Sequence, residues 1–270
     1  MANYKYGFIG AGNMGGALAA AAAKAVGGKN VVVSDHDGDK AKALASSIGA
    51  GVSDNESIAL SCDYIFLGVK PQVLGSMLGG ISKALKGRAG KYTVVSMAAG
   101  QSIETVRAAL GFDAPVIRIM PNTPASVGAG MILYAFSDNV SKKAVSGFLA
   151  SMATAGILDQ LDEKLIDAAC AVSGCGPAFV DLFIEALSDG AVECGLPRDK
   201  ALLYAAQTVF GSAKLALESG KHPAQLKDAV CSPGGSTIAG VRALEESGFR
   251  AAAIDAVLEA YGKTVYLGKK

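Results

Sequence analysis

Three glycines follow the apolar run Tyr6–Ile9 with the spacing Gly-x-Gly-x-x-Gly, and an alanine-rich helical stretch comes after them. In a strand–turn–helix unit the first glycine makes the tight turn, the second lets backbone approach a pyrophosphate, and the third lets the helix pack on the sheet. The helix start then offers free N–H groups and a positive dipole end to phosphate oxygens. The pattern predicts a site for a nicotinamide dinucleotide, NADPH or NADH. Its residues are Gly10, Ala11, Gly12, Asn13, Met14 and Gly15.

Ser34 and Asp35 lie at the end of the second predicted strand. In a dinucleotide-binding fold, this strand end contacts the adenosine ribose. A carboxylate at Asp35 would accept from the ribose 2′-hydroxyl and repel a 2′-phosphate, which favours NADH. The Ser34 hydroxyl could instead bond a 2′-phosphate, with His36 or Lys40 adding positive charge. Asp35 or Asp37 could also simply cap the next helix. The sequence therefore leaves both cofactors open.

Further candidate cofactor contacts follow the next three predicted strands, at the carboxyl ends where ligands of open α/β sheets bind. They are Val69, Lys70, Pro71, Ala98, Ala99 and Asn122. Small residues at 98–100 allow a dinucleotide to come close. Asn122 lies between two prolines, in a stiff loop that can hold side chains against the nicotinamide. Alternatively, Lys70 is a solvated charge and the loop at Asn122 is a purely structural turn.

A loop of glycines and small hydroxylic residues precedes a predicted helix near residue 237. Such a loop exposes several backbone N–H groups together, which is what an anionic carboxylate needs. We predict that it binds the substrate. Its residues are Ser232, Gly234, Gly235, Ser236 and Thr237. Thr237 could instead be an ordinary residue of a helix start.

The first 160 residues alternate β-rich runs with helical stretches, which is typical of a parallel sheet with crossover helices. We expect strands at residues 4–9, 30–34, 64–69, 92–96, 116–120, 131–135 and 157–161. Helices are expected at residues 14–26, 39–48, 71–85, 103–110 and 141–154. The predicted fold is α/β, with an N-terminal Rossmann-type doubly wound domain over residues 1–161.

From Asp162 onward the strand signals vanish, so residues 162–270 are predicted to form an all-α domain. Phe179, Phe183 and Leu187 recur at helical spacing and mark the buried face of a long helix. So much apolar helical surface on about 110 residues needs a partner subunit to cover it, which predicts a dimer.

Composition excludes several classes of protein. The net charge is +1 without a basic stripe, so we expect no nucleic-acid partner. Apolar runs are short and broken, and the N-terminus lacks a signal pattern, so we expect a cytoplasmic protein with no membrane partner. The five cysteines form no Cys-x-x-Cys pair and are interpreted as reduced thiols, and with two histidines we expect no metal site.

Several segments, in order along the chain, resemble pyrroline-5-carboxylate reductase. The resemblance spans essentially the whole chain. It is most specific at residues 226–238, followed by Val241, Leu244 and Glu245. Its other parts are residues 8–15, 69–71, 118–124 and 173–177.

This resemblance implies a Rossmann domain followed by a helical dimerisation domain. In the family, interleaved helices build the active site between two subunits, often within a larger ring of dimers. By matching position, Ser34 and Asn55 would meet the adenosine side of the cofactor, and residues 68–71 with Ala98 and Ala99 would line its course. Residues 232–237 correspond to the substrate loop. Two departures matter: Asp35 stands where the family more often has an uncharged residue, and Cys175 replaces a small Ser or Gly.

The implied reaction reduces 1-pyrroline-5-carboxylate to L-proline, the last step of proline biosynthesis. The hydride donor must lie about 3 to 3.5 Å from the imine carbon, and the iminium charge activates that carbon, so no strong general acid is needed. We expect N–H groups near residues 234–237 to hold the carboxylate. The Thr237 hydroxyl would bond the ring nitrogen, which makes Thr237 the catalytic residue.

Two other functions fit parts of the sequence. A β-hydroxyacid dehydrogenase also joins a Rossmann domain to a helical one and uses a lysine as acid and base. Its candidates here, Lys164 and Lys214, lack the Gly and Asn pattern that surrounds that lysine. A non-catalytic dinucleotide sensor would keep the glycine turn, but it would not need residues 226–245.

Overall fold

The computed structural model describes residues 5–88 and 92–268. Tyr4, which begins the first predicted strand, lies outside them. The chain divides into two compact units, the first made of residues 1–175 with 261–270 and the second of residues 176–260. We call them unit 1 and unit 2 and describe each by itself. The domain boundary after residue 161 stays a prediction.

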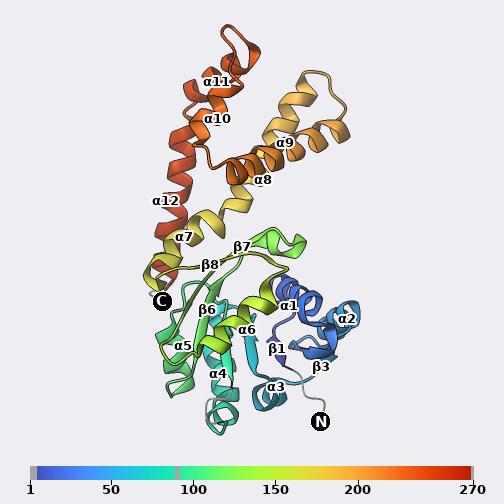
Figure 1. Cartoon of the computed structure of the whole chain (residues 1–270), viewed down its shortest axis with the longest axis vertical. Helices are drawn as coiled ribbons and strands as arrows, with labels where there is room; N and C mark the ends of the chain where they lie inside the picture. Colours follow the sequence, from blue (N-terminus) through green and yellow to red (C-terminus); the bar gives the residue numbers. More distant parts are fainter. Residues whose placement is uncertain (1–4, 89–91, 269–270) are drawn as a thin grey trace. The chain divides into compact units, whose positions relative to one another are not determined.

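Unit 1 contains one eight-stranded sheet with the order β3-β2-β1-β4-β5-β6-β7-β8 (Figure 1). All neighbouring strands are parallel except β6 and β7, which are antiparallel. The chain builds outward from β1 through β2 and β3, and then returns to the other side of β1 with β4. This reversal between β1 and β4 is a topological switch point, the place where open α/β sheets bind ligands.

The strands match the sequence prediction closely, because each is a short β-rich run between turn residues. They are β1 (Tyr6–Ile9), β2 (Val31–Ser34), β3 (Gly51–Val52), β4 (Tyr64–Leu67), β5 (Thr93–Ser96), β6 (Val116–Met120), β7 (Gly130–Phe136) and β8 (Gly156–Gln160). Only β3 was not predicted. It is two residues long and forms the edge of the sheet.

Helices and 3-10 turns lie between or just after the strands in the described part of unit 1. They are α1 (Asn13–Val26), η1 (Gly28–Asn30), α2 (Gly38–Ile48), α3 (Asn55–Ser61), α4 (Pro71–Lys86), α5 (Ile103–Leu110), η2 (Thr123–Val127), α6 (Lys142–Met152) and η3 (Glu163–Leu165). A further helix, α7 (Ile166–Ser173), ends the first segment of this unit. The seven-residue α3 was missed because it is too short to show a helical repeat.

The core has two layers, one on each face of the sheet. One layer packs the sheet against α3, α4, α5 and α7, with Leu78 and Ile166 fully buried. The other packs it against α1, α2 and α6, where Phe8 and Phe66 stack with ring centroids 4.3 Å apart. Both faces of the sheet are therefore covered, as a doubly wound fold requires.

Unit 2 is helical throughout. It contains α8 (Gly176–Glu193), α9 (Arg198–Ser219), α10 (Pro223–Ala229), α11 (Ser236–Glu246) and the first part of α12 (Phe249–Gly268). Gly195 and Gly220 take positive φ where helices end, as helix C-caps do.

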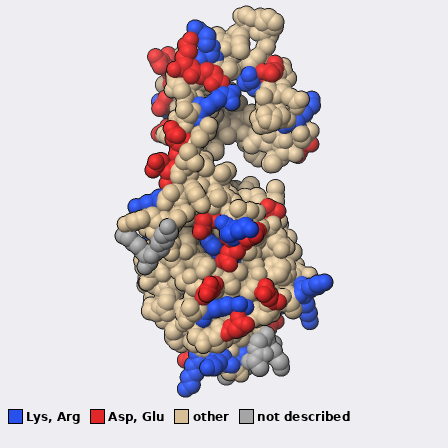
Figure 2. All heavy atoms as spheres, turned by 90° about the vertical axis from the view of Figure 1, so that its left-hand side faces the viewer, with Lys and Arg blue, Asp and Glu red and all other residues tan. Residues whose placement is uncertain are grey.

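The predicted buried face of the long helix is not buried within one chain. Ser188 is the one buried residue of α8, while Leu182, Leu203 and Leu217 are more than half exposed. By length and composition alone the helical stretch Glu163–Glu193 could even cross a membrane, contrary to the expectation of short apolar runs. The surface in Figure 2 nevertheless intersperses Lys and Arg with Asp and Glu.

Candidate functional site

The turn between β1 and α1 brings backbone against backbone at the switch point. A Cβ on Gly10 would lie 2.4 Å from the Gly68 carbonyl oxygen, and one on Gly15 would lie 2.1 Å from the Gly10 oxygen. Gly10 also has a φ of 108°, which favours glycine. By contrast, a Cβ on Gly12 would meet no atom within 4 Å. Gly10 and Gly15 are therefore needed for close packing, whereas Gly12 faces open space that a ligand can enter.

Helix α1 begins without a side-chain cap and without an acidic residue in its first turn. Its N-cap, Gly12, is in an extended conformation. The N–H groups of the first turn of a helix have no partner within the helix. This helix start can therefore receive phosphate oxygens, as the sequence predicts.

Asp35 ties the glycine turn to the end of β2. Its carboxylate accepts hydrogen bonds from the N–H groups of Ala11 at 2.6 Å and Asp37 at 2.9 Å, and His36 Nδ1 lies 2.8 Å away. Burial would raise the pKa of this carboxyl, but the two backbone N–H groups and His36 outweigh burial and lower it. Asp35 is therefore a negative charge at neutral pH. Asp37, not Asp35, caps α2.

Ser34 and Asn55 meet across the end of β2, where the Ser34 hydroxyl donates to Asn55 Oδ1 at 2.6 Å. They line a hollow of about 610 Å³ together with Asp35, Asp54 and Glu56. His36 also lines this hollow. Three carboxylates and one imidazole therefore surround the space at the end of β2.

A groove of about 770 Å³ runs from this region along the switch point. Its lining includes Gly10, Gly12, Asp35, Asn55, Val69 and Lys70. These are residues that the sequence selected from four separate segments, and the fold brings them together. Pro71 starts α4 beside the groove, while Ala98 is buried in the loop after β5.

Asn122 has both polar atoms engaged by the protein. Its Oδ1 accepts from the Met131 N–H at 2.9 Å, and its Nδ2 donates to the Ser173 carbonyl oxygen at 2.9 Å. Asn122 thus fastens the loop after β6 to the end of α7. Its cofactor contact stays a prediction, whereas the link to Ser173 is an arrangement that the sequence analysis missed.

Arg118 forms a second link between β6 and α7. It is buried, and it pairs with Asp167 at 2.5 Å and Glu163 at 3.4 Å. Glu163 also accepts from the N–H of Ile103, at the start of α5. Loss of either carboxylate would leave the buried Arg118 guanidinium with fewer partners, so these bonds fix η3 and α7 against β6.

Ser96, the last residue of β5, has a buried hydroxyl with no hydrogen-bond partner in the described part of the chain. It is the only such buried side-chain atom there. Ser96 pairs in register with Leu67 and Arg118 on the neighbouring strands. Unpaired buried hydroxyls are rare and costly, so this one marks the carboxyl edge of the sheet as polar.

The predicted substrate loop lies in unit 2. Gly234 has a φ of 68°, and the N–H of Gly235 donates to the Ser232 carbonyl oxygen at 3.0 Å. Gly235 is the N-cap of α11 and offers no side-chain cap. Ser236 and Thr237 are the first residues of α11, and Thr237 is exposed. The loop therefore presents an uncapped helix start with a hydroxyl beside it.

All five cysteines are free. Cys62 and Cys170 lie in the core, and burial raises the pKa of each thiol to about 11, so both are inert at neutral pH. Among the described residues no group of three or more His, Cys, Asp or Glu side chains could hold a metal ion.

Comparison with known proteins matches both units to described families. Residues 163–267 match the family described as pyrroline-5-carboxylate reductase dimerisation, and residues 5–100 match NADP oxidoreductase coenzyme F420-dependent. A pyrroline-5-carboxylate reductase of Methanosarcina acetivorans is 42% identical over 100% of both chains. One from Escherichia coli is 41% identical over 98% of both.

Solved structures give the same result. A Plasmodium falciparum pyrroline carboxylate reductase with NADP bound is 34% identical over 99% of both chains, with a TM-score of 0.87. A pyrroline-5-carboxylate reductase from Coxiella burnetii is 30% identical over 98% of both, with a TM-score of 0.88.

Two buried serines allow a matched test of the unpartnered hydroxyl. Ser96→Ala removes no hydrogen bond, so we expect the free energy of unfolding to stay the same or to rise by up to about 1 kcal/mol. Ser137 accepts from the Val116 N–H at 2.9 Å and donates to Asn139 at 2.7 Å. Ser137→Ala should therefore cost about 1–3 kcal/mol. Urea denaturation followed by circular dichroism measures both, and equal losses would contradict this account of Ser96.

Proposed function

The chain belongs to the pyrroline-5-carboxylate reductase family, and from this we propose that it transfers a hydride from NAD(P)H to the C=N carbon of 1-pyrroline-5-carboxylate, giving L-proline. The observation that carries the proposal is that full-length relatives of this family are about 40% identical to the chain. The groove at the switch point supports it, because a dinucleotide needs an open helix start beside a ribose-sized hollow.

On the cofactor side, we infer that the start of α1 holds the pyrophosphate and that Ser34, Asp35 and Asn55 face the adenosine ribose. NAD(P)H, when bound, supplies the hydride. The chain's own part is to bind and orient it. The N–H of Ala11 already donates to Asp35, so the N–H groups of Gly12, Asn13 and Met14 are the ones left for phosphate oxygens.

On the substrate side, the start of α11 would bind the carboxylate of the imino acid. Its uncapped N–H groups and dipole suit an anion, and no acidic residue in its first turn opposes one. The hydride and the two electrons it carries form a C–H bond while the C=N π pair moves to the ring nitrogen. That nitrogen is already protonated in the iminium, so Thr237 needs only to orient it by a hydrogen bond.

The lysines of the rival dehydrogenase are poorly suited to catalysis. Lys164 pairs with Asp162 at 2.9 Å and Lys214 lies 3.8 Å from Glu218. All four side chains are more than half exposed. A general acid and base needs a less solvated position, which supports imine reduction over hydroxyacid oxidation.

The apolar helices of unit 2 lie within the matched dimerisation region, so a homodimer is the assembly that covers them. We further propose a ring of dimers and a cytoplasmic location. The dimer would then hold the substrate loop of unit 2 in place.

A direct assay tests the proposed function. The purified protein is mixed with 1-pyrroline-5-carboxylate and NADH or NADPH, and the absorbance of the reduced nicotinamide is followed with proline as the measured product. We expect the amount of NADH or NADPH oxidised to rise in proportion to the amount of proline formed. Binding of the dinucleotide without oxidation would instead indicate a sensor, and activity only on β-hydroxyacids would indicate the dehydrogenase.

Removal of the Thr237 hydroxyl tests its role. Thr237→Ala should lower kcat/KM about tenfold to a thousandfold, the range found for loss of one placed hydrogen-bonding group. Thr237→Ser keeps the hydroxyl and should retain most activity. The affinity for NADH, measured from its fluorescence, should not change in either variant. Wild-type kinetics in Thr237→Ala would rule out the proposed contact.

Replacement of Asp35 tests the cofactor preference. Asp35→Asn removes the charge but keeps an oxygen that can accept from the Ala11 N–H. We expect the ratio of kcat/KM with NADPH to that with NADH to rise about tenfold or more, because a like charge no longer faces the 2′-phosphate. Asp39→Asn is the control, since Asp39 is exposed and pairs with Lys42 on α2. An unchanged ratio in Asp35→Asn would show that Asp35 does not set the preference.

A further inference from the structure

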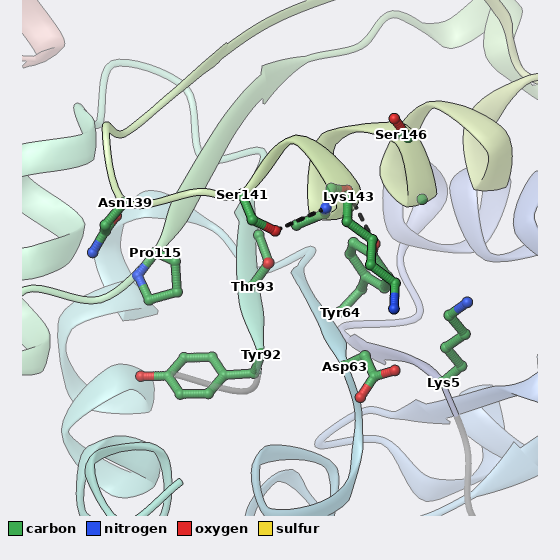
Figure 3. A pocket seen from close by; sticks show the side chains of 12 residues that line it. Lys5, Asp63, Tyr64, Tyr92, Thr93, Pro115, Asn139, Ser141, Lys143 and Ser146 are labelled. Atoms are coloured by element: carbon green, nitrogen blue, oxygen red, sulfur yellow. Dashed lines mark hydrogen bonds between the residues drawn. The ribbon is translucent and has the colours of Figure 1, made fainter. Parts of the chain in front are cut away.

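Two hollows of unit 1 are lined by charged side chains, and they lie at opposite edges of the sheet. At the amino edge, the exposed residues Lys5, Asp63 and Lys143 border a hollow of about 610 Å³ (Figure 3). The Tyr64 hydroxyl in its wall already donates to the Ala144 carbonyl oxygen at 3.0 Å. The three charges there are therefore solvated surface groups, and they indicate no ligand.

The hollow at the end of β2 differs because it holds a histidine in contact with a carboxylate. His36 and Asp35 line both this hollow and the cofactor groove. His36 Nδ1 lies 2.8 Å from Asp35 Oδ1. The His36 side chain is 92% exposed, whereas the Asp35 side chain is only 8% exposed. A largely buried carboxylate therefore holds an imidazole that remains open to solvent and to a ligand.

The Asp35 carboxylate determines which ring nitrogen of His36 carries a hydrogen. The lowered pKa of Asp35 keeps this carboxyl ionised at neutral pH, and an ionised carboxylate only accepts hydrogen bonds. The short contact with Asp35 therefore places a hydrogen on Nδ1. The other nitrogen, Nε2, is bonded to no residue in the described part of the chain. Nε2 is then an acceptor while the imidazole is neutral and a donor once it is protonated.

Other charged groups share the surroundings of His36. On α2, Lys40 lies 3.7 Å from Asp37. The remaining charged residues that line the groove or the hollow come from β2, α2, the start of α3 and the start of α4. They are Asp35, Lys40, Asp54, Glu56 and Lys70. Of these side-chain types and histidine, only histidine ordinarily changes its charge between about pH 6 and pH 8. The charge at this end of the groove therefore depends on pH through His36.

We propose that the charge of His36 sets the preference of the groove between NADPH and NADH. This inference rests on the proposed function, which places the adenosine ribose beside Asp35. Protonated His36 would donate from Nε2 to the 2′-phosphate of NADPH and offset the Asp35 charge that repels this phosphate. Neutral His36 would leave that charge unopposed, which favours the 2′-hydroxyl of NADH. The preference therefore shifts toward NADPH as the pH falls.

Binding of the oxidised dinucleotides tests this inference without any turnover. Isothermal titration calorimetry of the full-length protein gives the Kd of NADP⁺ and of NAD⁺ at about pH 6 and about pH 8, at constant ionic strength. The 2′-phosphate itself gains a proton near pH 6, so the wild type must be compared with a variant that lacks the imidazole. His36→Asn is suitable, because its amide can still donate to Asp35 but does not become charged.

The expected result concerns the ratio of the Kd of NAD⁺ to the Kd of NADP⁺. Between the higher and the lower pH, this ratio should rise about threefold to tenfold more in the wild type than in His36→Asn. One added charge beside a phosphate in a solvated groove changes affinity by about this factor. His36→Lys carries a fixed positive charge, so at about pH 8 it should bind NADP⁺ at least about threefold more tightly than the wild type.

His222→Asn is the matched control. His222 is the only other histidine of the chain, and it precedes α10 in unit 2. This variant should keep the pH dependence of the wild type. Equal pH dependence in His36→Asn and the wild type, or its loss in His222→Asn, would overturn the role of His36 and leave the proposed function intact. Failure of both dinucleotides to bind at either pH would overturn the proposed function and this inference with it.

Discussion

Direct contact between backbones at the carboxyl end of β1 determines the position of the cofactor groove. Gly10 and Gly15 lie against each other and against Gly68, so closely that a Cβ on Gly10 or Gly15 would overlap backbone atoms. This contact presses the start of α1 onto the switch point between β1 and β4. The Asp35 carboxylate then holds the turn from the side of β2, through the Ala11 N–H. Glycine packing and one partly buried carboxylate together place the helix start where the sheet reverses.

The secondary structure of unit 1 could be predicted because its signals are local. Each strand is a short apolar run, and several helix starts carry their own side-chain cap, such as Ser102 before α5 and Ser141 before α6. The two-residue β3 and the seven-residue α3 are too short to show a repeat. The antiparallel step between β6 and β7 depends on how the chain folds back after η2, which no periodicity records.

The contacts within the site could not be predicted, because they join residues far apart in the sequence. Asn122 was selected for its place between two prolines, but what it binds is the Ser173 carbonyl. Ser96 carries no sequence signal at all, since a serine that ends a strand is ordinary until its neighbours are known. Burial in unit 2 was misjudged for a different reason. The repeat of Phe179 and Phe183 marks an apolar face, but it does not say which chain covers that face.

Two groups of helix starts in this chain differ in how their first-turn N–H groups are satisfied. Helices α4, α7 and α9 belong to neither group, because they begin at Lys70, Leu165 and Pro197 without a side-chain cap. Helices α2, α3, α5 and α6 each begin with an Asp or Ser side chain that accepts from a first-turn N–H. Helices α1 and α11 instead begin at Gly12 and Gly235, both in the same extended conformation and both without a side-chain cap. Capping by a side chain stabilises a helix but uses the N–H groups that an anion would need. A glycine N-cap gives up that stabilisation and leaves the helix start open. The two helix starts left open in this way are the ones that the sequence assigns to pyrophosphate and to the substrate carboxylate, so one device serves both halves of the proposed reaction.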